Sequence, residues 1–367
     1  MRRSKYIAVA ERLSKRIRSG DYHIHGIPAE RDIAVDVGVS HMTARKALRK
    51  LLSDGLIYRL PNGRLDIRAN GQSARTVQSQ IALLAPAFES GETNDWNIAL
   101  SHLAGKFNFS TRLVYYMHPD DPIIKNTVDS FDCTFMLPPD PDESLVSELR
   151  KTGNPFFIIN SDWTRLGIPS IMLFPPVFIR KILDHLASLG HRRIDCLNVQ
   201  PGLTVIPDRI EQWKIWTGEH GFKGKLFNKP VRSFTDPLPA AYSIVDRMIR
   251  DGKFNSRALF CTTSPTALGA MSAMMDHGIL PGKDVAVCTS DSGGSCEYFK
   301  PSLTSMEALD AIPYLELCLK WIQDGGRRWK GSLLIQPENI NIVVRQSTVP
   351  DIDRKTTPER MLWKEEV

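Results

Sequence analysis

Short apolar runs alternate with helical patterns along most of the chain, from about residue 80 to residue 325. The runs have the length and composition of buried strands, and apolar residues recur at helical spacing between them. Strands are expected at 81–85, 112–116, 134–137, 156–160, 170–173, 193–197, 258–261 and 285–288. Helices are expected at 97–105, 143–151, 176–189, 208–220, 239–251, 265–277 and 308–325. This alternation predicts an α/β body with parallel sheets, helices on both faces and ligands beyond the strand ends.

The first 68 residues follow another pattern, with three short amphipathic helical segments and then a hairpin. Gly38 closes the second helical segment, and Ser40 can cap the third. Residues 56–60 and 64–68 then flank Pro61-Asn62-Gly63, which is a turn signal between two short strands. Two helices joined by a tight glycine turn, with a hairpin after them, predict a winged helix-turn-helix.

Charge is distributed unevenly between these two parts. Residues 1–68 hold 15 Lys and Arg against 7 Asp and Glu, which is a net charge of +8. Because the whole chain carries +6, the other residues sum to −2. A basic module on a nearly neutral body is typical of a protein whose smaller part binds a polyanion. On charge alone, a merely solvated basic surface is the alternative.

One ordered set of residues in this module matches a known family. It comprises Pro28-Ala29-Glu30-Arg31-Asp32-Ile33-Ala34, Gly38-Val39-Ser40, Thr43-Ala44-Arg45-Lys46-Ala47-Leu48, Leu51 and Gly55-Leu56-Ile57. These residues agree in order and without a gap, so residues 1–68 resemble the DNA-binding domain of the GntR (gluconate repressor) family. The resemblance implies that the start of the third helix enters the major groove of DNA.

The same resemblance implies a set of DNA contacts. Arg31, Thr43 and Arg45 match positions that contact DNA in the family, and Gly63 lies where the wing tip approaches the minor groove. His41 stands where the family often has arginine, so the base preference does not carry over. The expected DNA-binding residues are Arg31, Ser40, His41, Thr43, Arg45, Lys46, Gly63 and Arg64. For Arg31 and Arg45 the alternative is a surface salt bridge with Glu30 or Asp32, and Met42 is expected to pack.

A second ordered set lies in the body. It comprises His185-Leu186, Leu189-Gly190-His191-Arg192-Arg193-Ile194, Arg209, Ala267-Leu268-Gly269-Ala270, 281–287, 301–305 and 344–348. This set resembles the effector-binding domain of the LacI (lactose repressor) family, a two-lobed relative of periplasmic sugar-binding proteins. GntR-type heads on LacI-type bodies occur in arabinose-repressor-like regulators, to which this chain is similar. We expect a DNA-binding domain at 1–68, a linker at 69–79, an effector-binding and dimerisation domain at 80–350 and a charged tail at 351–367.

The sugar-gripping positions of that family are partly replaced here. Phe174-Pro175 stands where the family has Asp-Asn, Thr263-Ser264 stands where it has Asn-Asp, and only Arg209 and Asp291 remain. An unpaired buried polar group costs about 1 to 3 kcal/mol, so such a pocket has been refitted for another ligand or has stopped binding one. The expected effector-binding residues are Trp96, Trp163, Phe174, Arg209, Thr263, Ser264 and Asp291. Trp96 and Trp163 could equally belong to the core, and for Trp213 and Trp216 the core is favoured.

Several function classes lack support in the sequence. No run of about 18 apolar residues or signal peptide occurs, so a cytoplasmic protein with no membrane partner is expected. Six scattered cysteines lack metal-ligand spacing and are expected to be buried, reduced thiols. A pyridoxal-phosphate enzyme fused to such a head would need a cofactor lysine and a phosphate cradle, and neither is found. We therefore expect no enzyme activity, no metal and no cofactor.

These observations together predict a sequence-specific transcription regulator. We expect a homodimeric repressor that binds a double-stranded DNA operator and is controlled by a small-molecule effector such as a sugar or sugar derivative. The alternative is a dimeric DNA-binding protein whose effector pocket no longer binds a ligand.

Overall fold

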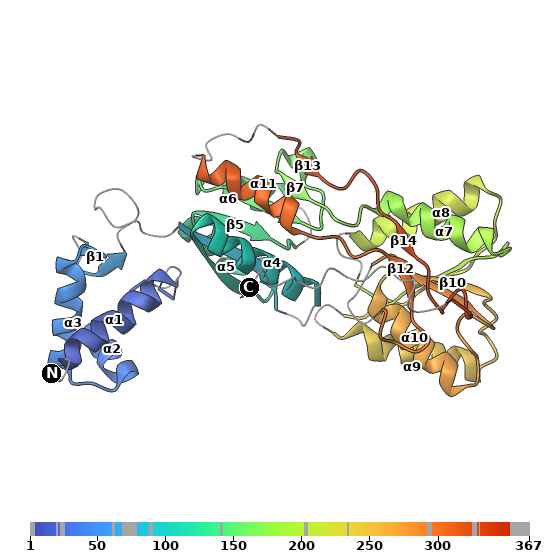
Figure 1. Ribbon diagram of the computed structural model, residues 1–367, viewed down its shortest axis with the longest axis horizontal. Coiled ribbons are helices and arrows are strands. Elements are labelled where there is room, and N and C mark those ends of the chain that lie inside the picture. The colour runs from blue at the N-terminus through green and yellow to red at the C-terminus, as the bar shows by residue number, and fades with distance from the viewer. Residues whose placement is uncertain are drawn as a thin grey trace.

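A small helical head and two α/β lobes follow one another along the long axis of the molecule in the computed structural model (Figure 1). The structure describes residues 4–19, 21–22, 26–60, 63–67, 79–87, 91–139, 142–201, 205–232, 235–291, 296–324, 329 and 331–352. Most of the expected linker and of the expected charged tail lies outside these residues. Within the described part, no helix is both long and apolar enough to cross a membrane.

The head is a winged helix-turn-helix, as the sequence predicts. Its elements are α1 Lys5–Arg18, α2 Glu30–Val37, α3 His41–Ser53, β1 Ile57–Arg59 and β2 Leu65–Ile67. The apolar faces of the three helices meet around Leu13, Ile33 and Leu48, which are buried. Gly38 ends α2 in the left-handed region, at a φ of 69°, where a glycine has no side-chain penalty. β1 and β2 pair antiparallel and form the wing.

The N-terminal lobe contains an all-parallel sheet with helices on both faces. Its strands are β3 Ser79–Pro86, β4 Phe109–Tyr116, β5 Cys133–Met136, β6 Phe156–Ile159, β7 Ser170–Ile171 and β13 Leu334–Ile335, in the order β13-β7-β6-β5-β3-β4. Its helices are α4 Gly91–Phe107, α5 Pro122–Ser130, α6 Glu143–Arg150, α11 Ile312–Gln323 and the short η1 Thr164–Leu166. α4 and α11 cover one face of the sheet, and α5 and α6 cover the other.

The C-terminal lobe repeats this plan. Its strands are β8 Asp195–Asn198, β9 Leu226–Asn228, β10 Ala258–Cys261, β11 Ala286–Thr289, β12 Thr304–Met306 and β14 Ile342–Val343, in the order β14-β12-β11-β10-β8-β9. Its helices are α7 Ile179–Ser188, α8 Val205–Glu219, α9 Pro237–Arg250, α10 Ser264–Asp276 and the short η2 Pro176–Phe178. α9 and α10 lie on one face, and α7 and α8 lie on the other. β14 pairs antiparallel with β12, which the alternating pattern did not predict.

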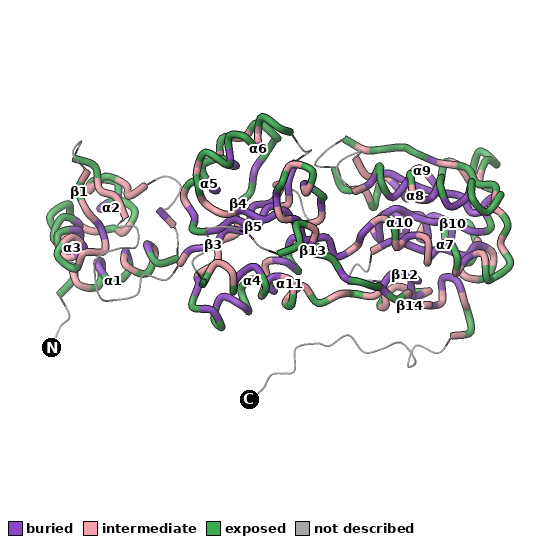
Figure 2. Tube along the Cα trace, turned by 90° about the horizontal axis from the view of Figure 1, so that it is seen from above, coloured by how far each residue is buried: buried purple, intermediate pink, exposed green. Residues whose placement is uncertain are grey.

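The described chain passes between the two lobes three times, at 172–175, 307–311 and 336–341. Buried residues lie along the interior of both lobes, and the connecting segments run between the two lobes (Figure 2). All six cysteines are free and buried within the lobes, as expected. A doubly wound sheet binds ligands beyond the carboxyl ends of its strands, and these connections place two such ends on either side of one cleft.

Candidate nucleic-acid interface and effector cleft

The amino end of α3 is capped and lies at the surface of the head. Ser40 Oγ accepts a hydrogen bond of 3.3 Å from the backbone N–H of Thr43, so Ser40 caps α3 as expected. The two hydroxyl oxygens of Ser40 and Thr43 lie 2.8 Å apart. The amino end of a helix carries a partial positive charge, and an anion such as a DNA phosphate is favoured there.

Exposed side chains surround this helix start. His41, Arg45, Lys46 and Arg31 are all exposed, and His41 and Arg45 share one face of α3 because they are four residues apart. Glu30 Oε2 lies 3.3 Å from His41 Nε2 and 3.9 Å from Arg45 Nε. The salt bridge considered as an alternative for Arg45 is therefore present. A pair this exposed contributes only about 0 to 1 kcal/mol, so it does not prevent Arg45 from reaching DNA.

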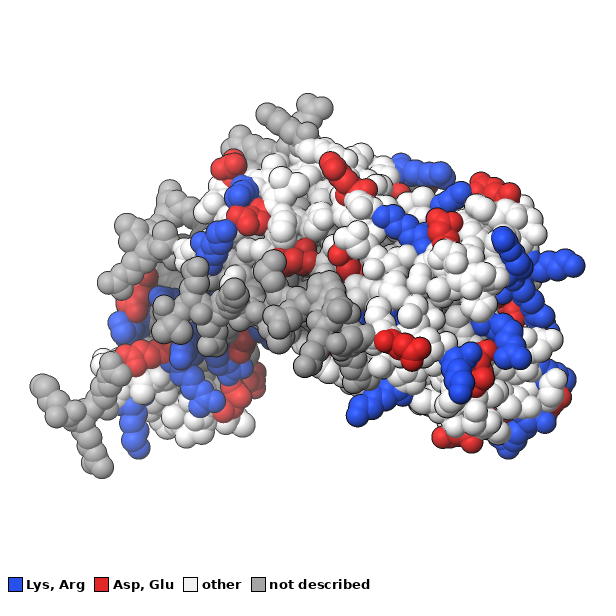
Figure 3. All heavy atoms as spheres, turned by 45° about the vertical axis from the view of Figure 1, so that its right-hand side comes forward, with Lys and Arg blue, Asp and Glu red and all other residues white. Residues whose placement is uncertain are grey.

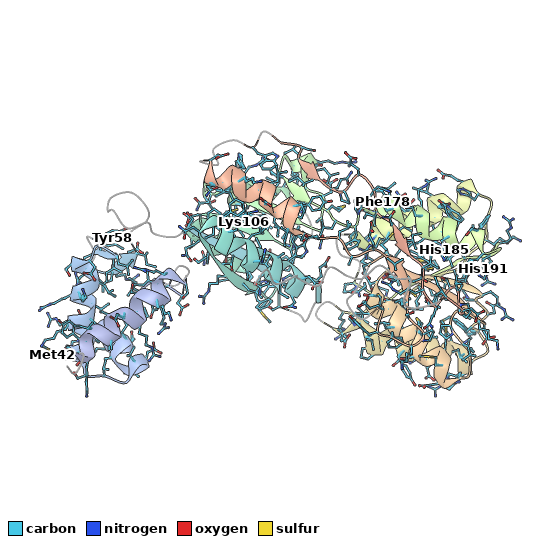
Figure 4. All side chains as sticks on the ribbon, viewed as in Figure 1. Met42, Tyr58, Lys106, Phe178, His185 and His191 are labelled. Carbon is cyan, nitrogen blue, oxygen red and sulfur yellow. The ribbon has the colours of Figure 1, made fainter. Side chains whose placement is uncertain are left out.

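Met42 differs from the prediction. It is 57 % exposed rather than packed, because the second position of α3 faces away from the three-helix core. Figure 4 shows Met42 at the end of the head farthest from the body. An exposed apolar side chain beside His41 and Lys46 suits contact with a thymine methyl group, a role that no sequence pattern indicates directly.

The described part of the wing presents Gly63 and Arg64 to solvent. Leu60 N–H donates to the carbonyl of Arg64 at 2.8 Å, and Arg59 Nη1 donates to the carbonyl of Gly63 at 2.7 Å. Gly63 has a φ of 84°, a conformation that a residue with a side chain rarely adopts. Pro61 and Asn62 of the expected turn lie outside the described residues.

Charge is not confined to the head. Figure 3 shows lysine and arginine side chains on the C-terminal lobe as well, mixed with carboxylates. Arg192, Lys223 and Lys225 are exposed there, and Arg192 and Lys225 lie over the rings of Phe222 and Phe227. The small net charge of the body therefore results from both signs being present.

The structure brings Arg209 and Asp291 together in the C-terminal lobe. Arg209 Nη1 donates to the carbonyl of Thr262 at 2.7 Å and lies 3.5 Å from Asp291 Oδ2. Asp291 Oδ1 accepts a hydrogen bond of 2.6 Å from the backbone N–H of Ser264 at the start of α10. The side chain of Arg209 is 8 % exposed, and that of Asp291 is 23 % exposed. The carboxylate thus combines an arginine partner, a helix amino end and access to solvent.

Thr263 and Ser264 line the same strand end, but their hydroxyls are nearly buried. Thr263 Oγ1 accepts from Gln200 Nε2 at 2.9 Å and lies 2.9 Å from Thr266 Oγ1. Ser264 contributes its backbone N–H to Asp291. Ser264 therefore holds the carboxylate of Asp291 through its backbone, whereas the hydroxyl of Thr263 pairs with Gln200 and Thr266. Both residues present little polar surface of their own.

Glu92 reaches the same cleft from the N-terminal lobe. It stands at the second position of α4, and Asn160, which follows β6, donates a hydrogen bond to its carboxylate. Desolvation by the surrounding protein raises the pKa of Glu92 to about 7, and the negative charges of Asp291 and Asp95 raise it further, whereas the charge of Arg209 and the hydrogen bond from Asn160 lower it. The side chain nevertheless keeps access to solvent. Sequence reasoning missed Glu92, although a polar residue at a helix start after a strand is a usable signal.

Phe174 lies at the junction of the lobes. Together with Pro175, Phe178, Ile179, Arg209, Ser290, Met306 and Ile340 it lines a cavity of about 10 Å³. A cavity of this size holds about one water molecule. Figure 4 shows Phe178 at this junction. The Phe174-Pro175 replacement thus gives this end of the cleft an apolar wall beside Arg209.

The four tryptophans considered for the cleft lie in the cores and do not line it. Trp96 packs among α4, α11 and the sheet at 2 % exposure, and Trp163 is fully buried on the opposite face of that sheet. Trp213 and Trp216 are buried in the C-terminal lobe, where their indole N–H groups donate to Ile194 O and Asp184. Large rings gain more from burial than from exposure at a cleft wall, so Trp96 and Trp163 have no part in the site described here.

Two domain families match this chain. Residues 5–66 match the family described as "Bacterial regulatory proteins, gntR family", and residues 183–311 match the "Periplasmic binding protein-like domain". The chain is 39 % identical over 56 residues to the HTH-type transcriptional repressor NagR of Bacillus subtilis, which covers 15 % of this chain and 23 % of that protein. It is 26 % identical over 168 residues to an uncharacterized HTH-type transcriptional regulator in the aml 5'region of Streptomyces limosus, which covers 44 % of this chain and 45 % of that one. The chain thus spans less than half the length of the curated relatives it matches.

The fold of the body has known counterparts. A lac repressor dimer bound to operator and the anti-inducer ONPF has a TM-score of 0.62 at 17 % sequence identity, covering 74 % of this chain and 94 % of that one. The chain therefore combines a winged helix-turn-helix that matches the gntR family model with a body that has the two-lobed fold of the lac repressor and contains the periplasmic-binding-protein-like match. Both matched families and the relatives above are named as regulators or binding domains, which agrees with the expectation that this is no enzyme. The closer similarity to arabinose-repressor-like regulators stays a prediction.

Proposed function

We propose that this protein is a sequence-specific DNA-binding transcription regulator whose body binds a small-molecule effector. The observation that carries the proposal is a capped α3 with an exposed cationic start, on a chain that also folds into a two-lobed body. The relatives named above are regulators. One of them is a repressor, which supports repression over activation of transcription for this chain. A homodimer follows from the need for two heads on paired half-sites.

The DNA contacts that we propose are made by Arg31, Ser40, His41, Thr43, Arg45, Lys46, Gly63 and Arg64. Arg45 lies on the exposed face of α3 one turn from its amino end, which supports a contact between its side chain and a base edge. Ser40 and the first turn of α3 are placed to meet a phosphate. The exposed Met42 adds an apolar contact within the same surface.

The experiment for this part uses the full chain on a random-sequence duplex. Fluorescence anisotropy at increasing salt should show an affinity that falls steeply, because lysine and arginine contacts to phosphate release counterions. The matched control is the same titration with the net charge of the head reduced by Lys46→Gln and Arg31→Gln, which should lower the slope. No binding at low salt, or binding that salt does not change, would refute the proposal.

For the effector, we propose the cleft between Glu92 and Asn160 on one lobe and Arg209 and Asp291 on the other. Phe174 supplies an apolar wall, Ser264 N–H holds Asp291 in place, and Thr263 lies beside Ser264 at the same strand end. Carboxylates, an amide and one guanidinium can bind the hydroxyl or amino groups of a small polar molecule, so a sugar or sugar derivative suits the site. Trp96 and Trp163 are not needed for it.

A second candidate function has one observation in its favour. Arg209, Asp291 and the hydroxyl of Thr263 already have partners within the protein, so no buried polar group in this cluster needs a ligand. The body would then serve dimerisation alone. Thermal unfolding of the full chain against a panel of sugars, amino sugars and sugar acids separates the two functions, since a specific ligand raises the melting temperature by mass action.

A further inference from the structure

The head rests on the amino ends of two strands of the N-terminal lobe. Gln80 Nε2 on β3 donates to the carbonyl of Arg18 at 2.7 Å, and Ser110 Oγ on β4 donates to the same oxygen at 3.1 Å. Arg112 Nη1, also on β4, lies 2.8 Å from Asp21 Oδ1 and 3.4 Å from the carbonyl of Ser19. Gln80, Ser110 and Arg112 form what we call the docking surface.

The donors and the cation of the docking surface complement the carboxyl end of α1. The last carbonyl groups of a helix have no partner within the helix, and the end carries a partial negative charge. Gln80 and Ser110 are register neighbours on adjacent parallel strands, so two donors converge on one such carbonyl. Arg112 adds a cation beside the same helix end. The chemistry of the two parts is therefore complementary, with donors and a cation facing acceptors.

Ion pairs also connect the docking contact to helices α1 and α2 of the head. Asp21 binds Arg112 through one carboxylate oxygen and Arg16 through the other, and Arg16 in turn pairs with Asp36 on α2. Burial alone would raise the pKa of Asp21, but hydrogen bonds from Arg112, Arg16 and Ser19 lower it below its usual value. Asp21 thus stays ionised and links α1 and α2 to the body.

Docking leaves the DNA-reading surface free. The docked end of α1 points toward the N-terminal lobe, whereas α3 lies on the other side of the head (Figures 1 and 2). Met42 at the start of α3 projects away from the body (Figure 4). The contact therefore fixes the direction of α3 without covering it.

We infer that the docking surface holds the head of the same chain in a fixed orientation and thereby sets which half-site spacing a dimer accepts. This inference rests on the proposed function. The linker expected at 69–79 has 11 residues, and a chain of that length can span up to about 36–40 Å. One turn of DNA is about 34–36 Å, so a head held by the linker alone could follow half-sites shifted by half a turn. A head held by the docking surface cannot follow half-sites that are shifted in this way.

The first arm of the test needs no DNA. Small-angle X-ray scattering of the full chain is compared for wild type, Arg112→Ala and the double variant Ser110→Ala/Arg112→Ala. The matched control is Arg165→Ala, an exposed arginine on the same lobe outside the docking surface. An exposed ion pair shifts an equilibrium about 1.5- to 5-fold and a hydrogen bond adds a few-fold, so the double variant should show the larger maximum dimension. Scattering of the double variant identical to that of Arg165→Ala would overturn the docking.

The second arm uses duplexes carrying two copies of the half-site that wild type selects from a random pool. Wild type and Arg165→Ala should lose tenfold or more in affinity when 5 base pairs are inserted between the half-sites, whereas the double variant should lose less than about threefold. All proteins should bind a single half-site equally, which shows that the heads are intact. Equal spacing dependence in every protein would overturn the inference. If wild type selects no DNA, the proposed function fails and the spacing claim fails with it, while the scattering still decides whether the head docks.

Discussion

Recognition of the DNA sequence by this protein should depend most on the side chain of Arg45. It is exposed one turn into α3, and within the described head its acidic neighbour is Glu30, at a distance of 3.9 Å. Arg45→Ala should therefore reduce affinity for a selected duplex by about 1 to 3 kcal/mol, which is roughly 5- to 150-fold, without unfolding the head. Anisotropy titration measures the loss, and circular dichroism checks the fold. Equal affinity of Arg45→Ala and the control Arg165→Ala would place Arg45 outside the interface.

Glu92 makes the stability of the body depend on pH. Its folded pKa of about 7 lies above the usual value of 4.5, so the folded state holds the proton more tightly than the unfolded state does. The contribution of this bound proton to the stability of the folded state is complete below about pH 4.5. It is lost as the pH rises through about 7. Glu92→Gln should therefore melt like wild type at pH 5 and at a higher temperature at pH 8. Because solvent reaches this side chain, we expect a gain of at most about 1 kcal/mol.

The control for Glu92 is Glu148→Gln on α6, an exposed carboxylate far from the cleft. Its melting temperature should differ from that of wild type by the same small amount at both pH values. A Glu92→Gln variant that behaves in the same way would show that the pKa of Glu92 is not raised in the folded protein.

The sequence predicted some of these residues and not others for a physical reason. Arg209 and Asp291 were predicted together because each keeps its place in a family motif, and the structure brings them within 3.5 Å. Glu92 and Asn160 lie in the N-terminal lobe and are 68 residues apart in the sequence, so no motif joins them before the fold brings them into contact. Met42 was expected to pack because apolar residues usually do, whereas its position on α3 faces solvent. A tryptophan on an amphipathic helix carries the same ambiguity, which the structure resolves toward the core for Trp96.

At the scale of elements, two variants of Ser40 at the start of α3 distinguish its role as a helix cap from its role in DNA contact. Ser40→Ala removes the hydroxyl that accepts from Thr43 N–H, and this should destabilise the head by about 0.5 to 2 kcal/mol. Ser40→Asp keeps a good cap but places a negative charge where a phosphate is expected. Chemical denaturation should therefore find Ser40→Asp as stable as wild type, while anisotropy finds it binding DNA more weakly. If Ser40→Asp binds as wild type does, no phosphate lies at this helix end.

Long, periodic elements were predictable, and short edge elements were not. The strands from β3 to β8, β10 and β11 fall within a few residues of the expected ranges, since most of them contain or adjoin a short apolar run. β13 and β14 have two residues each, and β9 has three, which is too short for any periodicity to show. α5 was also missed, although Pro122 follows a capping Asp121. α4 begins at Gly91 rather than 97 because its first turn is polar and lines the cleft instead of the core.

At the scale of the whole molecule, the cleft and the heads should be coupled through the arrangement of the lobes. A ligand held by both lobes favours the arrangement it fits, and it can shift an equilibrium only through different affinities for the two states. Asp291→Ala should weaken binding of any compound that raises the melting temperature and should abolish the effect of that compound on DNA affinity. DNA affinity without the compound should stay nearly unchanged. Asp291→Asn keeps one acceptor for Ser264 N–H, so its affinity for the compound should lie between those of wild type and Asp291→Ala.

The most direct test of the central claim is selection of DNA by the purified full-length protein from a random-sequence pool. The account predicts enrichment of one sequence motif that occurs as two half-sites related by two-fold symmetry, about one helical turn or a multiple of it apart. Arg45→Ala, selected in parallel, should lose that motif while still retaining DNA at low salt. A pool that stays random after selection by the wild-type protein would contradict the claim that this chain is a sequence-specific regulator.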